Sequence, residues 1–198
     1  HYLNMLNKYF NYNVQKLTKE NLQSRIRGIY LMAYSNNYSS LLISTGNKSE
    51  MSVGYSTIYG DMNGGFNVLK DIYKTDVYKL ANWRNKFEHK KFNGPKGLVI
   101  PENSIEKPPS AELSKNQKDI DSLPDYHSLD EILYLLNEND LSVEEVIKKG
   151  HSKALVTKVR NMFIKSEYKR RQAPPGIKIS TKAFGKERRY PITNSYTN

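Results

Sequence analysis

Residues 42–60 constrain the fold of this chain most, because a short apolar run there leads into a cluster of glycines. Residues 42–46 (LISTG) end the apolar run in small hydroxyl side chains, and residues 47–50 (NKSE) then supply a cation and a carboxylate. Glycine tolerates positive φ and lets the backbone approach a ligand closely. The pattern predicts a strand that leads into a nucleotide-binding loop, although an ordinary strand followed by a polar loop would look the same.

Length and composition narrow the classes of protein to which this chain can belong. The chain has 198 residues, a net charge of +11 and no cysteine. The length allows one sizeable core or two small lobes, and the positive charge favours anionic partners. The lack of cysteine excludes a disulfide framework and a cysteine nucleophile within these residues, and no apolar run is long enough to span a membrane. These features predict a cytoplasmic protein without a membrane partner.

Periodicity predicts short strands between helices. Apolar residues recur at three- or four-residue steps after Leu17, which predicts a helix with Thr18 as its N-cap. Residues 41–43 and 67–69 are expected to be short buried strands, and residues 74–84 a second helix. The side chains expected to face inward are Leu22, Ile26, Ile29 or Tyr30, and Ala33 in the first helix, and Val77, Leu80, Ala81 and Trp83 or Phe87 in the second.

Prolines and helix-capping residues divide the second half of the chain into a loop region, helices and a tail. Residues 88–127 contain five prolines and are expected to form a long loop region. Ser128 and Ser142 each precede a glutamate by three residues, which predicts two capping boxes, and three helices are expected before a C-terminal tail at residues 174–198. The apolar stripes of these helices are expected to be Leu129, Ile132, Leu133 and Leu136, and then Leu155, Val159, Met162 and Phe163.

Six segments place polar and charged side chains in a distinctive series along the chain. They are residues 20–28 (ENLQSRIRG), 44–50 (STGNKSE), 54–61 (GYSTIYGD), 107–113 (KPPSAEL), 121–126 (DSLPDY) and 167–172 (EYKRRQ). The series resembles the synthetase domain of NAD synthetase from about residue 17 to residue 196, and residues 188–193 (RRYPIT) resemble its glutamine-dependent branch. The resemblance implies an α/β fold with a doubly wound parallel sheet of the ATP-pyrophosphatase (adenine nucleotide alpha hydrolase-like) type, here incomplete and helix-rich.

The resemblance also implies a reaction. The family converts deamido-NAD to NAD by an ATP-dependent amidation, through an adenylated intermediate that releases AMP and pyrophosphate. ATP and magnesium are therefore expected, with nitrogen from glutamine or ammonia. A homo-oligomer and an upstream glutaminase domain are implied by the family alone.

Site residues are carried over from the matching motifs. Taken singly, Lys74 is also an ordinary exposed helix start, and Glu50 an ordinary carboxylate in a first helical turn. The resemblance assigns ATP binding to Thr45, Lys74 and Ser110. It assigns deamido-NAD binding to Asn21, Arg25, Glu50, Tyr55, Ser56, Thr57, Ile58 and Lys169, with Glu50 as an alternative magnesium ligand.

Two family features are missing from these residues. The phosphate-binding loop, Ser-Gly-Gly-x-Asp-Ser, is absent, and so is the cysteine of a glutaminase. We therefore expect residues 1–198 to be the C-terminal portion of the synthetase domain, which binds ligands but is inactive when isolated, and we assign no catalytic residue.

Two alternatives remain open from the sequence. Another amidating or tRNA-modifying ATP pyrophosphatase would share the fold but not the segment GYSTIYGDMNGG. A basic nucleic-acid-binding module would fit the charge of +11 and the 15 tyrosines, yet the chain carries no recognisable nucleic-acid motif.

Overall fold

The computed structural model describes residues 1–114 and 116–193. Residue 115 of the expected loop region and residues 194–198 of the expected tail lie outside the described residues. The helices are α1 (Tyr2–Tyr9), α2 (Lys16–Asn37), α3 (Lys48–Val53), α4 (Lys74–Lys86), α5 (Glu102–Glu106), the 3₁₀ turn η1 (Asp119–Asp121), α6 (Tyr126–Asn137), α7 (Val143–Lys148), α8 (Lys153–Lys165) and α9 (Glu167–Gln172), and the strands are β1 (Ile43–Ser44) and β2 (Phe66–Asn67).

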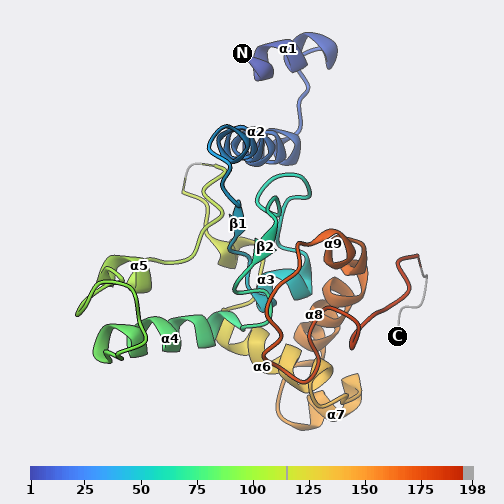
Figure 1. The fold of residues 1–198 in the computed structure, drawn as a ribbon. Coiled ribbons are helices and arrows are strands. Elements are labelled where there is room, and N and C mark those ends of the chain that lie inside the picture. Colours follow the sequence, from blue (N-terminus) through green and yellow to red (C-terminus); the bar gives the residue numbers. More distant parts are fainter. Residues whose placement is uncertain (115, 194–198) are drawn as a thin grey trace.

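The sheet is small and parallel. Ile43 lies opposite Phe66 and Ser44 opposite Asn67, so β1 and β2 run in the same direction. Gly176 adds one parallel bridge to Asn67 from the C-terminal segment. Short strands are therefore present, shifted by one or two residues, but the expected burial holds only for Ser44 and Asn67, and Ile43 is 41% exposed. Within the described residues the α/β fold is helix-rich (Figure 1).

The hydrophobic core lies where α3, α6 and α8 pack together (Figure 1). Every member of the predicted α6 stripe is buried. In α8, Val159 and Phe163 are buried, whereas Leu155 and Met162 are only partly covered. The 3.6-residue period therefore identified the core face of both helices, and α3 is held against that face.

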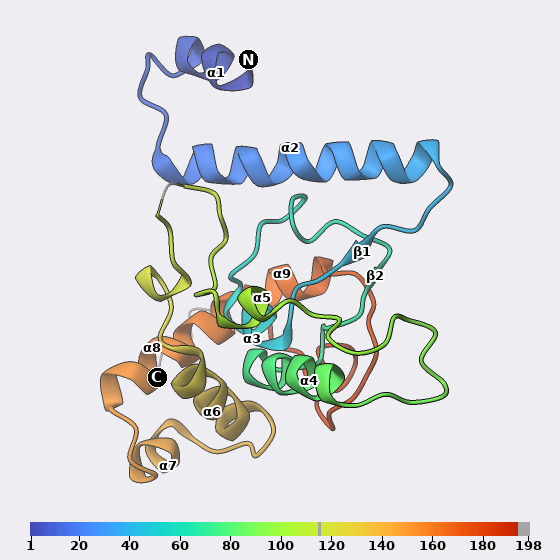
Figure 2. The same cartoon turned by 90° about the vertical axis from the view of Figure 1, so that its left-hand side faces the viewer.

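Helix α2 differs from its prediction. It begins at Lys16 with Gln15 as N-cap, so Thr18 lies inside the helix and caps nothing. Ser24 and Gly28 are its buried residues, while Ile29 is 64% exposed and Tyr30 is 73% exposed. The helix runs between α1 and the rest of the molecule (Figure 2), and its buried residues Ser24 and Gly28 lie close to Gly60.

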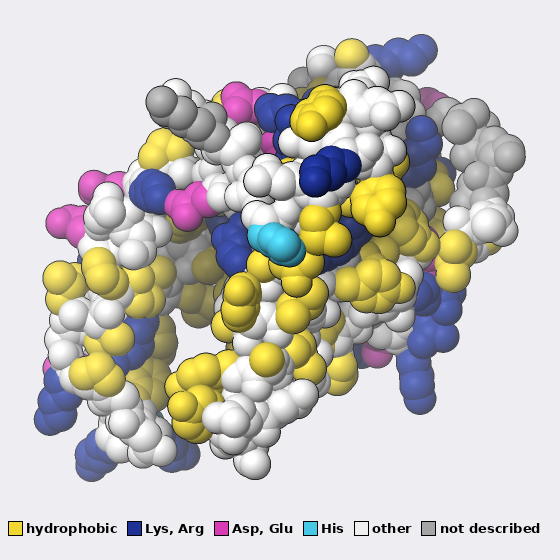
Figure 3. Space-filling model, turned by 90° about the horizontal axis from the view of Figure 1, so that it is seen from above, with side chains coloured by type: hydrophobic (Ala, Val, Ile, Leu, Met, Phe, Trp, Pro, Cys, Tyr) yellow, Lys and Arg dark blue, Asp and Glu magenta, His cyan; other side chains and the backbone are white. Residues whose placement is uncertain are grey.

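The predicted inward face of α2 was therefore wrong for residues 29, 30 and 33. That of α4 was wrong for Leu80, Trp83 and Phe87, whereas Val77 and Ala81 are partly covered. Helix α4 has no buried residue, and Leu80 is 46% exposed. Seen from above, hydrophobic side chains gather on the face where α1 and α2 lie (Figure 3). Helix α4 nevertheless packs against α3, α5 and α6, whereas the apolar side chains of α2 at residues 29–32 are all exposed.

Helix boundaries correct three further expectations. Four helices, α6 to α9, lie where three were expected, because α8 ends at Lys165 and α9 begins at Glu167. Helix α6 begins at Tyr126, and Asp125 accepts a hydrogen bond from the Ser128 amide, so Asp125 is the N-cap in place of Ser128. The capping box of Ser142 is confirmed. Residues 88–127 contain α5, η1 and the start of α6 as well as loop. Among the described residues, no helix is both long and apolar enough to cross a membrane.

Candidate functional site: two adjoining cavities around helix α3

The site is built around the ends of α3. At its start, Asn47 accepts a hydrogen bond from the Glu50 amide, and the Glu50 carboxylate accepts one from the Asn47 amide, which forms a capping box. At its end, Gly54 takes the left-handed conformation with φ of 69°. A side chain at Gly54 would collide with the Ser166 hydroxyl, so glycine is needed there for both conformation and space.

A first cavity of about 700 Å³ opens beside the start of α3. Thr45, Lys74 and Ser110, the residues expected to bind ATP, all line it, although they come from three separate parts of the chain. Ligand pockets typically have volumes of about 300–1,000 Å³, so this cavity is large enough for a nucleotide. The structure therefore brings the three expected ATP residues to one place.

Glu50 and Lys74 face each other in this first cavity. The Glu50 carboxylate lies 3.5 Å from the Lys74 ammonium. Burial raises the pKa of Glu50, although Lys74 and the hydrogen bond from Asn47 both act in the opposite direction. The ammonium of Lys74 also lies over the rings of Tyr78 and Tyr126. Lys74 is therefore a placed cation in a cavity wall and not a freely solvated helix start.

A second cavity of about 540 Å³ lies beside the end of α3. Seven of the eight residues expected to bind deamido-NAD line this cavity, and the exception, Glu50, lines the first cavity. The seven are Asn21, Arg25, Tyr55, Ser56, Thr57, Ile58 and Lys169. Arg25 donates to the Ile58 carbonyl at 3.2 Å, and Thr57 donates to the Asn21 side chain at 3.3 Å.

Lys169 fixes the loop that forms one wall of the second cavity. Its ammonium donates to the carbonyls of Gly54 and Ser56, both at 2.7 Å. An ammonium has three donors, so one remains beyond these two bonds. Burial lowers the pKa of Lys169, and the nearby Asp61 opposes that effect. Lys169 thus shapes the pocket as well as lining it.

The two cavities share a wall. Tyr55, Ser56, Asp61 and Ala111 line both of them. The Tyr55 hydroxyl and the Ser56 hydroxyl are buried and make no hydrogen bond that meets ordinary geometry. Burial and the neighbouring Asp119 carboxylate raise the pKa of Tyr55, so its phenol stays protonated at neutral pH. Both hydroxyls can serve a polar group of a ligand.

Asp119 is a residue of the first cavity that the sequence analysis missed. It is only 4% exposed, lines the cavity, and accepts a hydrogen bond from the Tyr126 hydroxyl at 2.7 Å. Its other carboxylate oxygen is buried and makes no hydrogen bond of ordinary geometry, although the carboxylate lies beside the Tyr55 hydroxyl. Its position between the segments KPPSAEL and DSLPDY was the signal that could have identified it.

A metal would find carboxylates at this site, but not a complete set of protein ligands. No group of three or more acidic or histidine side chains is arranged to hold a metal among residues 1–114 and 116–193. Glu50 and Asp119 both line the first cavity. Magnesium is commonly held by one or two carboxylates together with substrate phosphates, so these two residues fit a magnesium–nucleotide complex.

Comparisons with known proteins agree with the motifs. A family model described as NAD synthase matches residues 1–173. A glutamine-dependent NAD(+) synthetase of Thermotoga maritima is 51% identical over 195 residues, which cover 98% of this chain and 33% of that protein. One of Acinetobacter baylyi is 53% identical over 179 residues, which cover 90% of this chain and 32% of that protein.

A solved structure shows the same fold at lower identity. The glutamine-dependent NAD(+) synthetase of Cytophaga hutchinsonii matches with a TM-score of 0.76 and 22% identity, over 98% of this chain and 32% of that chain. The chain spans about a third of the length of the curated relatives that it matches. Because the family model covers most of the chain, up to residue 173, this protein belongs to the NAD synthase family.

Proposed function

We propose that this chain supplies the ATP and deamido-NAD sites of a glutamine-dependent NAD synthetase. The reaction is the amidation of deamido-NAD to NAD, with release of AMP and pyrophosphate. The single observation that carries the proposal is the pair of adjoining cavities around α3, one lined by Thr45, Lys74 and Ser110 and the other lined by the residues assigned to deamido-NAD except Glu50.

The shared wall suits the chemistry of the first step. The nicotinate carboxylate of deamido-NAD attacks the α-phosphate of ATP, so one ligand from each cavity must meet at a single point. In the proposed arrangement that point lies near Tyr55 and Ser56, which line both cavities. Their hydroxyls are buried and make no hydrogen bond of ordinary geometry, although that of Tyr55 lies beside Asp119, and binding a ligand there would satisfy them.

Charge in the first cavity suits nucleotide phosphates. Lys74 offsets phosphate charge, which increases in the transition state of adenylation. Glu50 and Asp119 would hold magnesium, which neutralises phosphate charge when it is bound. Between them, Lys74 and Glu50 keep the start of α3 fixed beside the phosphates.

The second step consumes ammonia. Ammonia attacks the adenylated carboxyl group, AMP leaves, and the amide of NAD remains. We propose that the ammonia comes from glutamine, as the names of the curated relatives indicate for those proteins. A glutaminase domain would then lie in another part of the protein.

We further propose that residues 1–198 form the C-terminal portion of the synthetase domain, with residues 88–127 as an irregular region at the first cavity. The parallel pair β1–β2 would belong to a larger doubly wound sheet, and the Ser-Gly-Gly-x-Asp-Ser loop would lie upstream. A homo-oligomer is part of the same proposal, because α1 and α2 expose a broad apolar face (Figure 3).

The decisive experiment assays the intact natural polypeptide with ATP, magnesium, deamido-NAD and either glutamine or ammonia. Formation of NAD together with AMP is the expected result. Absence of both products under every combination would overturn the proposal. Binding of nucleic acid that weakens steeply with salt and ignores ATP would instead support the basic-module alternative.

The assignment of the two cavities has its own test. Lys74→Met should raise KM for ATP by about tenfold, and Lys169→Met should raise KM for deamido-NAD by a similar factor, because each removes a cation from one cavity. Steady-state kinetics with each substrate varied in turn would measure both. The reverse pattern would show that the cavities are wrongly assigned.

A further inference from the structure

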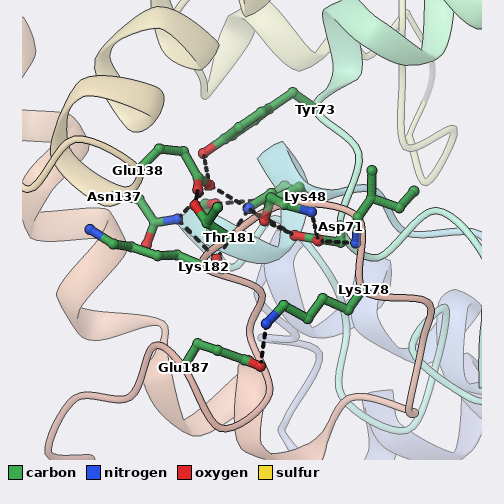
Figure 4. Close-up of polar contacts among 12 residues, drawn as sticks. Lys48, Asp71, Tyr73, Asn137, Glu138, Lys178, Thr181, Lys182 and Glu187 are labelled. Carbon is green, nitrogen blue, oxygen red and sulfur yellow. Dashed lines mark hydrogen bonds and ion pairs between the residues drawn. The ribbon is translucent and has the colours of Figure 1, made fainter.

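Lys48 stands in the middle of the STGNKSE segment, yet neither ligand is assigned to it. Its side chain is fully buried, with 0% exposure. The ammonium lies 2.8 Å from Asp71, 2.5 Å from Glu138 and 2.6 Å from the Ser180 hydroxyl (Figure 4). A buried ammonium is costly unless it is paired, so these partners define what Lys48 does.

The partners of Lys48 come from distant parts of the chain. Asp71 precedes α4, Glu138 follows α6, and Ser180 belongs to the C-terminal segment that follows α9. The Lys182 carbonyl, in the same segment, lies 3.2 Å from the ammonium. One buried cation therefore joins the start of α3 to three other segments.

Asp71 and Glu138 together carry two negative charges, whereas Lys48 supplies one positive charge. Hydrogen-bond donors from the C-terminal segment stabilise the negative charge that remains. Asp71 accepts hydrogen bonds from the Ile179 amide at 2.7 Å, the Ser180 amide at 2.6 Å and the Ser180 hydroxyl at 2.8 Å. Glu138 accepts hydrogen bonds from Asn137 at 2.9 Å and from the Thr181 hydroxyl at 3.4 Å. These bonds make the segment a structural member of the cluster (Figure 4).

The C-terminal segment lies beyond residue 173, where the match to the family model ends. It is nevertheless attached to the elements of the site. The Asn67 amide donates to the Pro175 carbonyl at 2.8 Å, and the Lys70 ammonium donates to the Pro174 carbonyl at 2.6 Å. The segment therefore runs beside β2 before it reaches Lys48.

We propose that Lys48 is a positioning residue, through which residues 174–182 hold the nucleotide cavity in its binding shape. Two connections carry this effect. Lys48 is the first residue of α3, so it is bonded directly to Asn47 and lies two residues before Glu50, the two members of the capping box. Asp71 lies three residues before Lys74, the cation of the first cavity.

The proposal rests on the proposed function and extends it to a segment that contributes only Pro174 to the lining of the first cavity and nothing to that of the second. Removing Lys48 would leave Asp71 and Glu138 buried without their cation, and one of the carboxylates would then protonate or turn toward water. Either response moves the segment, the start of α3, or both. The expected consequence is weaker binding of ATP, with a smaller effect on the chemical step.

The experiment uses the intact natural polypeptide and measures dissociation constants for ATP by calorimetry. Lys48→Met should weaken ATP binding by at least about tenfold, while the exposed Lys149→Met should leave it unchanged. Hydrogen exchange should become faster at the amides of Ile179 and Ser180, which donate to Asp71. In kinetics, KM for ATP should rise more than kcat falls.

A milder variant keeps the test valid if Lys48→Met does not fold. Ser180→Ala removes the hydroxyl that touches both Lys48 and Asp71, and it should weaken ATP binding about threefold to tenfold. Where both variants fold, the double variant should bind ATP no more weakly than Lys48→Met alone, because the two residues act through one cluster.

The outcomes separate this inference from the proposed function. If the wild-type protein binds neither ATP nor deamido-NAD, the proposed function is overturned and the inference with it. If the wild-type protein binds ATP and Lys48→Met or Ser180→Ala binds it equally well, the inference alone is overturned. Equal losses of kcat and ATP affinity, with unchanged exchange at residues 179 and 180, would also contradict it.

Discussion

Helices α6 and α8 differ from α2 and α4 in what they bury, although all four have apolar residues at helical spacing. Ile132 and Leu133 of α6 are fully buried, as is Val159 of α8. In α2 and α4 the corresponding apolar side chains, such as Tyr30 and Leu80, are largely exposed. Periodicity therefore predicts that a helix has an apolar side, but burial also needs a partner, and α6 and α8 are partners of each other.

The largest loss of stability is expected for a substitution in the core, on α6. Leu133→Ala should lower the free energy of unfolding by about 2–5 kcal/mol, because it leaves a cavity among fully buried side chains. The matched change Leu80→Ala on α4 should cost well under half as much. Urea unfolding of both variants measures the difference, and equal losses would show that α4 is covered in the native protein.

A change in the Lys48 cluster should have the next largest effect. Asp71→Asn replaces bonds to a charged acceptor by bonds to a neutral one, so we expect a loss of about 1–2 kcal/mol at neutral pH. Although burial opposes them, hydrogen bonds from Lys48, Ser180 and Ile179 keep the pKa of Asp71 below its ordinary value.

The same carboxylate predicts a pH dependence. A lowered native pKa stabilises the protein above the unfolded pKa, about 3.9 for aspartate, and this stabilisation is lost as pH falls through the native pKa. Wild type should therefore lose more stability than Asp71→Asn on acidification below about pH 4. Unfolding free energies measured along this series would test it, and parallel curves would contradict it.

The smallest effect on stability is expected on α2. Tyr30→Ala should change the free energy of unfolding by less than about 0.5 kcal/mol, because Tyr30 is exposed. It should nevertheless weaken self-association of the intact protein, which sedimentation velocity would measure. A large loss of stability without any change in association would show that another part of the same polypeptide covers this face.

Sequence reasoning succeeded where the necessary information is local. The α6 stripe and the Ser142 capping box depend on residues within one or two helical turns, and both are present. The assignment of Ser128 as a cap failed because Asp125 competes for the same role three residues earlier. The motif resemblance assigned Thr45 and Ser110 to ATP, and the structure places both in the first cavity, although residue patterns alone do not connect them.

Contacts between side chains far apart in the chain could not be predicted from the sequence. Lys48 looks like an exposed lysine in a polar segment, and its burial follows from partners 90 and 132 residues away. The buried Arg170 is similar: its side chain pairs with Glu167 and donates to the Ser52 carbonyl at 2.7 Å. No periodicity carries such information.

The wall shared by the two cavities also bears on inhibitor design. A molecule that crosses Tyr55 and Ser56 would occupy both cavities at once, so that its second half binds at the high effective concentration set by a short tether. Two weak fragments, one for each cavity, could therefore be joined into a much tighter compound. Four common lining residues, including Asp61 and Ala111, define where such a tether must pass.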